Sequence, residues 1–114
     1  MKKIIASLLL AVSLPSYAFF YDGNQLSAWN NARKKALNNN AETVDYLDAG
    51  VYRGFVIATY NAFQNTTICP EPGITVGQVE DVVGLYLDNH PELRTKPASE
   101  LAYKALASAF PCKK

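Results

Sequence analysis

Few residues in this chain could support catalysis, and their spacing does not favour it. The chain has two cysteines, Cys69 and Cys112, and one histidine, His90. Two thiols and one imidazole cannot supply the four protein ligands of a closed metal site. His90 lies directly before a proline at an expected helix end, which is more typical of a helix cap than of a catalytic base. We therefore predict no catalytic residue, no metal and no cofactor.

The carboxylates are no better candidates for catalysis. Glu80 and Asp81 are adjacent, and adjacent side chains on a helix do not face each other. Asp45 and Asp48 share a helix face, but acidic residues near the start of a helix commonly stabilise its dipole. The sequence also lacks a glycine-rich phosphate-binding loop. We expect that the protein is not an enzyme.

The amino-terminal residues 1–18 have the pattern of a secretory signal peptide. Lys2 and Lys3 precede an apolar run from Ile4 to Leu14, and Ser16-Tyr17-Ala18 has the small-x-small form of a cleavage site. The run is too short for a bilayer, which needs roughly 20 residues. We therefore expect cleavage after Ala18 and export to the periplasm, rather than a retained membrane anchor.

Removal of this segment would leave residues 19–114 as a single domain. Loss of Lys2 and Lys3 leaves nine basic and ten acidic residues, a formal charge of −1. This charge provides no basic surface for nucleic acid. In an oxidising compartment we expect Cys69 and Cys112 to form a disulfide rather than remain free thiols. Closing a loop of about 44 residues would stabilise such a small domain by roughly 4 kcal/mol in the chain-entropy description.

The spacing of apolar residues predicts an all-α fold, a small bundle of about four main helices. The first is expected from about Asn24 to Leu37 and the second from Glu42 to about Phe63. A third should begin at Thr75, where Thr75 and Gln78 form a capping box, and end at Asn89-His90-Pro91. The fourth should open near Thr95 to Pro97 and stop before Pro111.

Each expected helix has an apolar set that we predict to be its buried face. On the first helix, Arg33-Lys34-Lys35 is placed on the solvated side. On the second, Gly50 and Gly54 lie on or beside the apolar face, and they indicate close packing of another element or, alternatively, a break in the helix. The predicted core residues are Leu26, Trp29, Ala32 and Ala36 or Leu37; Val44, Leu47, Val51, Phe55, Ala58 and Ala62; Val79, Val82, Val83, Tyr86 and Leu87; Leu101, Ala102, Ala105, Leu106 and Ala109.

An ordered series of short motifs runs from Cys69 to Cys112 and resembles a known family. With both cysteines in place, the series is similar to the Rap/Tai immunity proteins, periplasmic partners of type VI secretion amidase effectors. A weaker likeness lies in residues 22–26 and 54–56. The motifs are Cys69-Pro70-Glu71-Pro72-Gly73-Ile74-Thr75, Gly77-Gln78-Val79, Val82-Val83, Tyr86-Leu87, His90-Pro91, Ala105-Leu106 and Ala109-Phe110-Pro111-Cys112.

The chain departs from this family pattern at one pair of positions. Relatives often have a second cysteine pair, but here Asn30 (or a neighbour) and Tyr52 occupy the corresponding places. The first helix must then be held by packing, for which Leu26 and Trp29 are the candidates.

The resemblance implies a stoichiometric inhibitor that protects the producing cell and its siblings. Its partner would be a secreted peptidoglycan amidase, whose papain-like Cys/His cleft the inhibitor would block. We expect the loop from Gln64 to Gly73 to be the blocking element, since its prolines and the disulfide limit its freedom. Its alternative role is that of a solvated connector. The loop residues expected to reach the partner are Asn65, Thr66, Thr67 and Glu71.

Two further expectations concern partners. The link from His90 to Lys96 is a second candidate surface, in which His90 and Arg94 would contact the effector. The resemblance also implies a possible homodimer. The main alternative function is a small periplasmic chaperone for acid stress, which would expose apolar surface when its carboxylates are protonated.

Overall fold

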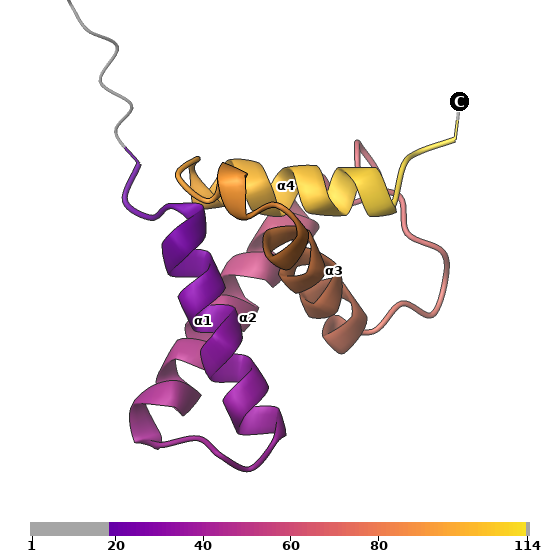
Figure 1. The fold of residues 1–114 in the computed structure, drawn as a ribbon. Helices are drawn as coiled ribbons and strands as arrows, with labels where there is room; N and C mark the ends of the chain where they lie inside the picture. Colours follow the sequence, from indigo (N-terminus) through magenta and orange to yellow (C-terminus); the bar gives the residue numbers. More distant parts are fainter. Residues whose placement is uncertain (1–18, 114) are drawn as a thin grey trace, which may run out of the picture.

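The computed structural model describes residues 19–113, so the predicted signal peptide at residues 1–18 lies outside the described part of the chain. The predicted all-α fold is confirmed within that part. The helices are α1 (Gly23–Leu37), α2 (Thr43–Phe63), α3 (Val76–Asn89) and α4 (Ala98–Ala109), with a short 3-10 turn, η1 (Pro91–Leu93), between the last two (Figure 1).

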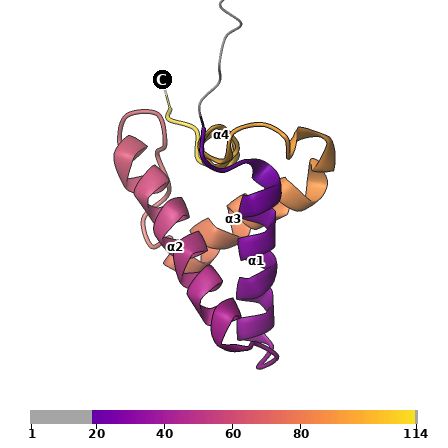
Figure 2. The ribbon, with the colours of Figure 1, turned by 90° about the vertical axis from the view of Figure 1, so that its left-hand side faces the viewer.

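The four helices pack around one core, with α3 and α4 placed against the pair formed by α1 and α2. α1 and α2 make an antiparallel hairpin that is closed at one end by residues 38–42 and widens towards α4 (Figure 2). α4 lies across the open end of this hairpin, and α3 packs against α1, α2 and α4. A long loop connects the end of α2 to the start of α3 and passes the carboxyl-terminal end of α4 (Figure 1).

Most of the predicted core of α1, α3 and α4 is confirmed. The expected capping box of α3 forms, with Thr75 Oγ1 accepting from the Gln78 amide at 3.2 Å. Ala109 is an exception, because it is exposed at the last position of α4, where the chain turns away. The predicted residues found buried are Leu26, Trp29, Ala32, Val79, Val83, Leu87, Leu101, Ala102, Ala105 and Leu106.

The predicted buried face of α2 is wrong except at Phe55, which is half-buried and packs against the core. Val44, Leu47 and Val51 are 57%, 67% and 40% exposed, whereas Tyr52 and Val56 on the opposite side of the helix are completely buried. The side of α2 that bears Tyr52 also bears Asp45, Asp48 and Thr59, so the spacing of the apolar residues pointed to the other side. The structure selects the Tyr52 side, where the tyrosine hydroxyl donates to the Glu80 carbonyl oxygen at 2.7 Å.

The expectation for Gly50 and Gly54 is also wrong. A Cβ atom at either position would meet nothing within 4 Å, and α2 continues through both without a break. Close packing occurs instead at Gly23 and Gly84. A Cβ at Gly23 would lie 2.7 Å from Arg94 Cα, and one at Gly84 would lie 2.7 Å from Asn30 Nδ2.

The amino end of α1 is tied to the segment that precedes α4. The Gly23 amide donates to the Lys96 carbonyl at 3.0 Å, and the Asn24 amide donates to the Arg94 carbonyl at 2.9 Å. Asp22 caps the helix by accepting from the Gln25 amide at 2.9 Å. Three of the orphan donors in the first turn of α1 are therefore satisfied, two of them by residues about 70 positions later.

Candidate functional site

The loop between α2 and α3, residues 64–75, is fastened at its middle, and we call it the stapled loop. The predicted Cys69–Cys112 disulfide is present and joins the loop to the chain beyond α4. The Cys69 amide also donates to the Phe110 carbonyl at 2.8 Å, and Ile68 is completely buried in the core. Disulfide, hydrogen bond and buried side chain thus hold one short stretch of the loop against α4 (Figure 1).

The first turn of the stapled loop has a defined backbone. The amides of Thr66, Thr67 and Ile68 all point to the Phe63 carbonyl oxygen, each at 3.1 Å, and the Asn65 amide donates to the Ile68 carbonyl at 2.8 Å. Asn65 has a φ of 64°, in the left-handed region that asparagine tolerates better than most residues. Much of the ordering of this turn is therefore complete before any partner arrives, which lowers the entropy lost on docking.

The side chains of this turn point away from the core and are polar. Asn65, Thr66, Thr67 and Glu71 are all exposed. The Thr66 hydroxyl donates to the Phe63 carbonyl at 2.8 Å, and Glu71 lies 3.8 Å from Lys113 in an exposed ion pair that contributes little to stability. The loop can therefore offer amide, hydroxyl and carboxylate groups to the backbone and side-chain amides of another protein.

At the second predicted surface, the side chains of His90 and Arg94 contact mainly the carboxyl-terminal end of α3. His90 is the C-cap of α3, as predicted, and its Nδ1 lies 2.8 Å from the Tyr86 carbonyl while its ring stacks on Tyr86. Arg94 Nε donates to the Leu87 carbonyl at 3.0 Å. These contacts satisfy carbonyls that the helix end leaves open.

The structure does not bring the two predicted surfaces together. The stapled loop is joined to the carboxyl end of α4 through Cys112, whereas the link with His90 and Arg94 precedes the amino end of α4. The 12 residues of α4 span about 18 Å, at about 1.5 Å per residue. A single narrow cleft would not take both surfaces.

A buried ionic cluster connects α1 to α3. Arg33, which we predicted on the solvated side of α1, is only 8% exposed. Its Nε lies 2.9 Å from Glu80 Oε2, and its Nη2 lies 2.9 Å from Asp81 Oδ1. Adjacent carboxylates can meet at one guanidinium because its fork spans both. Glu80 is 1% exposed, so its charge depends on this pairing.

Two residues of α2 complete the cluster. Arg53 Nε donates to Glu80 Oε1 at 3.0 Å from the solvent side. Tyr52 donates its hydroxyl to the Glu80 carbonyl, and burial raises the pKa of that phenol well above its ordinary range. Glu80 therefore receives contacts from both arms of the hairpin, and the cluster fixes α3 between them.

The sequence contained a positional signal for this cluster. Arg33 follows Leu26 by seven residues, which places both on the same side of α1, and Glu80 lies three residues before Val83 and seven before Leu87, both of them buried. A charged residue in register with a buried stripe needs a partner. Composition alone could not pair the two, because they come from helices separated by the whole of α2.

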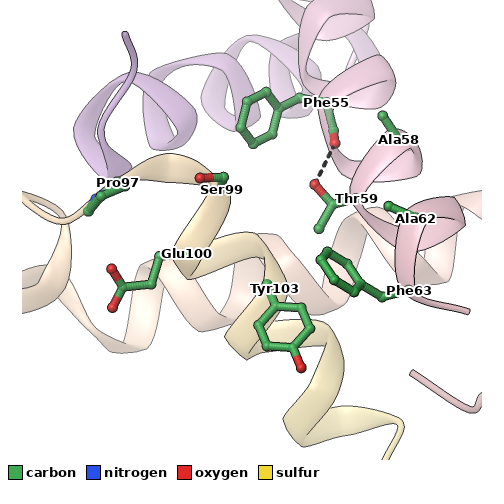
Figure 3. Close-up of a pocket in the computed structure, with 9 residues that line it drawn as sticks. All are labelled: Phe55, Ala58, Thr59, Ala62, Phe63, Pro97, Ser99, Glu100 and Tyr103. Atoms are coloured by element: carbon green, nitrogen blue, oxygen red, sulfur yellow. Dashed lines mark hydrogen bonds between the residues drawn. The ribbon is translucent and has the colours of Figure 1, made fainter. Parts of the chain in front are cut away.

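A groove runs between α2 and α4 (Figure 3). Its volume is about 680 Å³, and apolar side chains dominate its walls. Phe63 and Tyr103 pack together at one end, with ring centroids 4.7 Å apart. The lining residues are Phe55, Ala58, Thr59, Ala62 and Phe63 from α2, and Pro97, Ser99, Glu100 and Tyr103.

Comparison with known protein families identifies the family to which the chain belongs. Residues 22–112 match the family described as the Rap1a immunity proteins. The chain belongs to this family. The match begins at the cap of α1 and ends at Cys112, so it covers the amino-terminal half, where the likeness was weak, as well as the motifs that follow Cys69. No curated protein and no solved structure matches the chain.

The structure describes the surroundings of Asn30 and Tyr52, the two positions at which the resemblance places a cysteine pair in relatives. Asn30 and Tyr52 are both completely buried. Asn30 lies against Gly84 and Tyr52 bonds to Glu80, one turn apart on α3. Within residues 19–113, no cluster of three or more His, Cys, Asp or Glu side chains could hold a metal ion, and no helix is long and apolar enough to cross a membrane.

Proposed function

We propose that this Rap1a protein is a periplasmic immunity protein that binds a peptidoglycan amidase delivered by type VI secretion and blocks its active-site cleft. The stapled loop is the blocking element in this proposal. A protein that holds the amidase inactive would protect the producing cell and its siblings during delivery of the effector.

The rigidity of the stapled loop is the observation that carries this proposal. Three amides converge on the Phe63 carbonyl, and the Cys69–Cys112 disulfide fastens the loop a few residues later. The exposed amide and hydroxyls of Asn65, Thr66 and Thr67 stand on this fixed base. A peptide-stem substrate is rich in amides and carboxylates, so a cleft that binds it has hydrogen-bonding groups that the loop can occupy.

The role of Glu71 follows from its position beyond the disulfide. Glu71 is exposed, and its contact among residues 19–113 is a loose ion pair to Lys113 at 3.8 Å. Its carboxylate can stand in for a substrate carboxylate and approach a cationic or amide group of the amidase. We assign Asn65, Thr66, Thr67 and Glu71 to the partner contact, with His90 and Arg94 as a separate, secondary contact.

The test is inhibition of candidate secreted amidases by the purified, oxidised protein. We expect one-to-one binding that abolishes cleavage of peptidoglycan fragments. Asn65→Ala together with Glu71→Ala should weaken inhibition at least tenfold, about 1.4 kcal/mol. Asn31→Ala, an exposed asparagine on α1, is the matched control and should leave inhibition unchanged.

Two other outcomes assign the contact elsewhere or reject the function. If His90→Ala with Arg94→Ala weakens inhibition and the loop variant does not, the link before α4 is the contact and the loop is a connector. If no amidase is bound, the amidase assignment is wrong. The chaperone alternative stays a prediction, and circular dichroism from pH 7 to pH 2 tests it: retention of the helical signal without client protection would exclude it.

A further inference from the structure

The first half of the stapled loop, residues 64–68, is held by bonds within itself. The amides of residues 66–68 meet the Phe63 carbonyl, and Ile68 is completely buried and anchors this half in the core. Cys112 Sγ lies 3.4 Å from the Thr66 carbonyl oxygen, but sulfur is at most a weak donor and cannot hold the turn. The shape of the first half therefore does not depend on the disulfide.

The second half, residues 69–74, is held mainly at its first residue. Cys69 is bonded to Cys112, and its amide donates to the Phe110 carbonyl at 2.8 Å. Both partners lie beyond the end of α4, so the disulfide joins the loop to a tail that belongs to no helix (Figure 1). Without the disulfide, Cys69 would be held there by one neutral hydrogen bond, and exposed bonds of this kind open easily in water.

The rest of the second half has few contacts of its own. Among the described residues, the amides of Glu71, Gly73 and Ile74 donate to no other residue. Gly73 has a φ of 91°, a region open mainly to glycine, and Ile74 is half-buried against the core at the far end. The exposed ion pair of Glu71 with Lys113 leads back to the same tail. Glu71 is therefore positioned largely through Cys69.

From this difference we propose that the oxidation state of Cys69 and Cys112 sets how strongly the stapled loop binds its partner. The reduced chain presents the first-half residues Asn65, Thr66 and Thr67 in place, and oxidation adds Glu71 at a fixed position. The proposal rests on the proposed function, in which these loop residues contact the amidase. It adds a regulation that acts on one half of the loop and leaves the other unchanged.

The oxidation is a thiol–disulfide exchange with a protein disulfide of the periplasm. The thiols of Cys69 and Cys112 give up two electrons and two protons, the bond between them forms, and the oxidant's disulfide leaves as two thiols. Both cysteines are half-buried rather than buried, so the oxidant can reach them.

The location of each state gives the regulation its use. Thiols stay reduced in the cytoplasm and are oxidised in the periplasm. An inhibitor that is weaker before export would leave an amidase made in the same cytoplasm free to be loaded for secretion. The full contact would form in the compartment where an incoming amidase acts.

The first test needs no amidase and compares the full chain, purified from the periplasm, before and after reduction with dithiothreitol. Backbone order parameters from ¹⁵N relaxation should fall below about 0.6 at Glu71 and Gly73 on reduction, and stay near about 0.85 at Thr66 and Ile68. Unchanged order at Glu71, or an equal fall at Thr66, would overturn the proposal. Loss of the helical circular dichroism on reduction would also overturn it, because the disulfide would then control the whole fold.

The second test measures inhibition by two single variants, each oxidised and each reduced, with the reductant removed under nitrogen. Glu71→Ala should weaken inhibition about fivefold in the oxidised protein and less than about twofold in the reduced protein. Thr67→Ala, an exposed position in the first half, is the matched control and should weaken inhibition by the same factor in both states. An equal factor for Glu71→Ala in both states would contradict the proposal.

The two tests separate failure of this proposal from failure of the proposed function. If neither variant changes inhibition by the oxidised protein, the loop is not the contact and the proposed function loses its blocking element. If both variants act in the oxidised protein and Glu71→Ala acts equally in the reduced one, the loop is the contact and the redox dependence is rejected.

Discussion

The two halves of this molecule are fastened by different chemistry. The stapled loop and the chain after α4 are joined by a covalent bond, Cys69–Cys112. α1 is joined to α3 by a buried guanidinium and carboxylate, Arg33 and Glu80, close to Asn30 and Tyr52, the positions at which the resemblance places a cysteine pair in relatives. A disulfide acts mainly by restricting the unfolded chain, whereas a buried ion pair acts in the folded state and is sensitive to the loss of either partner.

Removing one partner of the ion pair should give the largest effect. Glu80→Ala leaves the buried Arg33 charge with the exposed carboxylate of Asp81 but without its buried partner, so we expect a loss of about 3 kcal/mol in the free energy of unfolding, at the lower end of such truncations. Urea denaturation measures it. Replacing both, Arg33→Met with Glu80→Leu, should recover most of the loss, and a double variant as unstable as the single one would contradict this account.

Removing the disulfide should have the next largest effect on stability, and the loss of structure should lie in the stapled loop rather than in α1. We expect Cys69→Ala with Cys112→Ala to lower the free energy of unfolding by about 2–4 kcal/mol. Hydrogen exchange should show lost protection at the amides of Cys69 and Phe110, with the α1–α3 contact retained. Equal loss of protection in α1 and in the stapled loop would mean that the two halves do not behave as separately fastened regions.

Tyr52→Phe should produce a smaller change with a characteristic pH dependence. Loss of the hydrogen bond to Glu80 should lower the free energy of unfolding by about 1 kcal/mol near neutral pH. The pKa of Tyr52 is raised in the folded state by burial, from an ordinary value of 10.0. Below that value the phenol is neutral in both states and its contribution is complete. Above it only the unfolded state ionises, so stability falls by up to about 1.4 kcal/mol per pH unit.

The measurement for Tyr52 is the difference between wild type and variant. Phenylalanine cannot ionise, so the advantage of the wild-type protein should shrink as the pH rises through 10. A difference that stays constant over this range would mean that Tyr52 ionises equally in both states.

Gly50→Ala should give the smallest effect, and it should be favourable. A methyl group there meets nothing within 4 Å, and alanine is the better residue in a helix interior, so we expect a gain of about 0.5–1 kcal/mol. Thermal melting of the isolated protein at low concentration measures this change. A lower melting temperature would indicate that a contact covers Gly50 even in dilute solution.

The sequence predicted the helices well because their signals are local. The capping box at Thr75 and Gln78, the stripe of Val79, Val83 and Leu87, and the proline-interrupted loop depend on neighbours within a few residues. The disulfide was also predictable, since only one pairing is possible between two cysteines.

The errors lie where polar residues share the buried side of a helix or where two distant helices meet. On α2 the buried side bears Asp45 and Asp48 as well as Tyr52, and its burial depends on partners in other helices such as the Glu80 carbonyl, which α2 itself does not encode. The pairing of Arg33 with Glu80 likewise depends on the tertiary arrangement. For the candidate site, the sequence indicated the stapled loop and its exposed residues, but not the convergence of three amides on the Phe63 carbonyl that fixes its shape.

The way α1 begins also has a consequence for the order of folding. The α1–α2 hairpin needs only a short connection, residues 38–42, and short-range contacts close quickly. The amides of Gly23 and Asn24, in contrast, are satisfied by the carbonyls of Lys96 and Arg94. A chain that emerges amino terminus first must therefore expose nearly all of its length before its first turn finds these acceptors. α1 is thus the first helix to be synthesised, but its amino-terminal amides are among the last to find their hydrogen-bond acceptors.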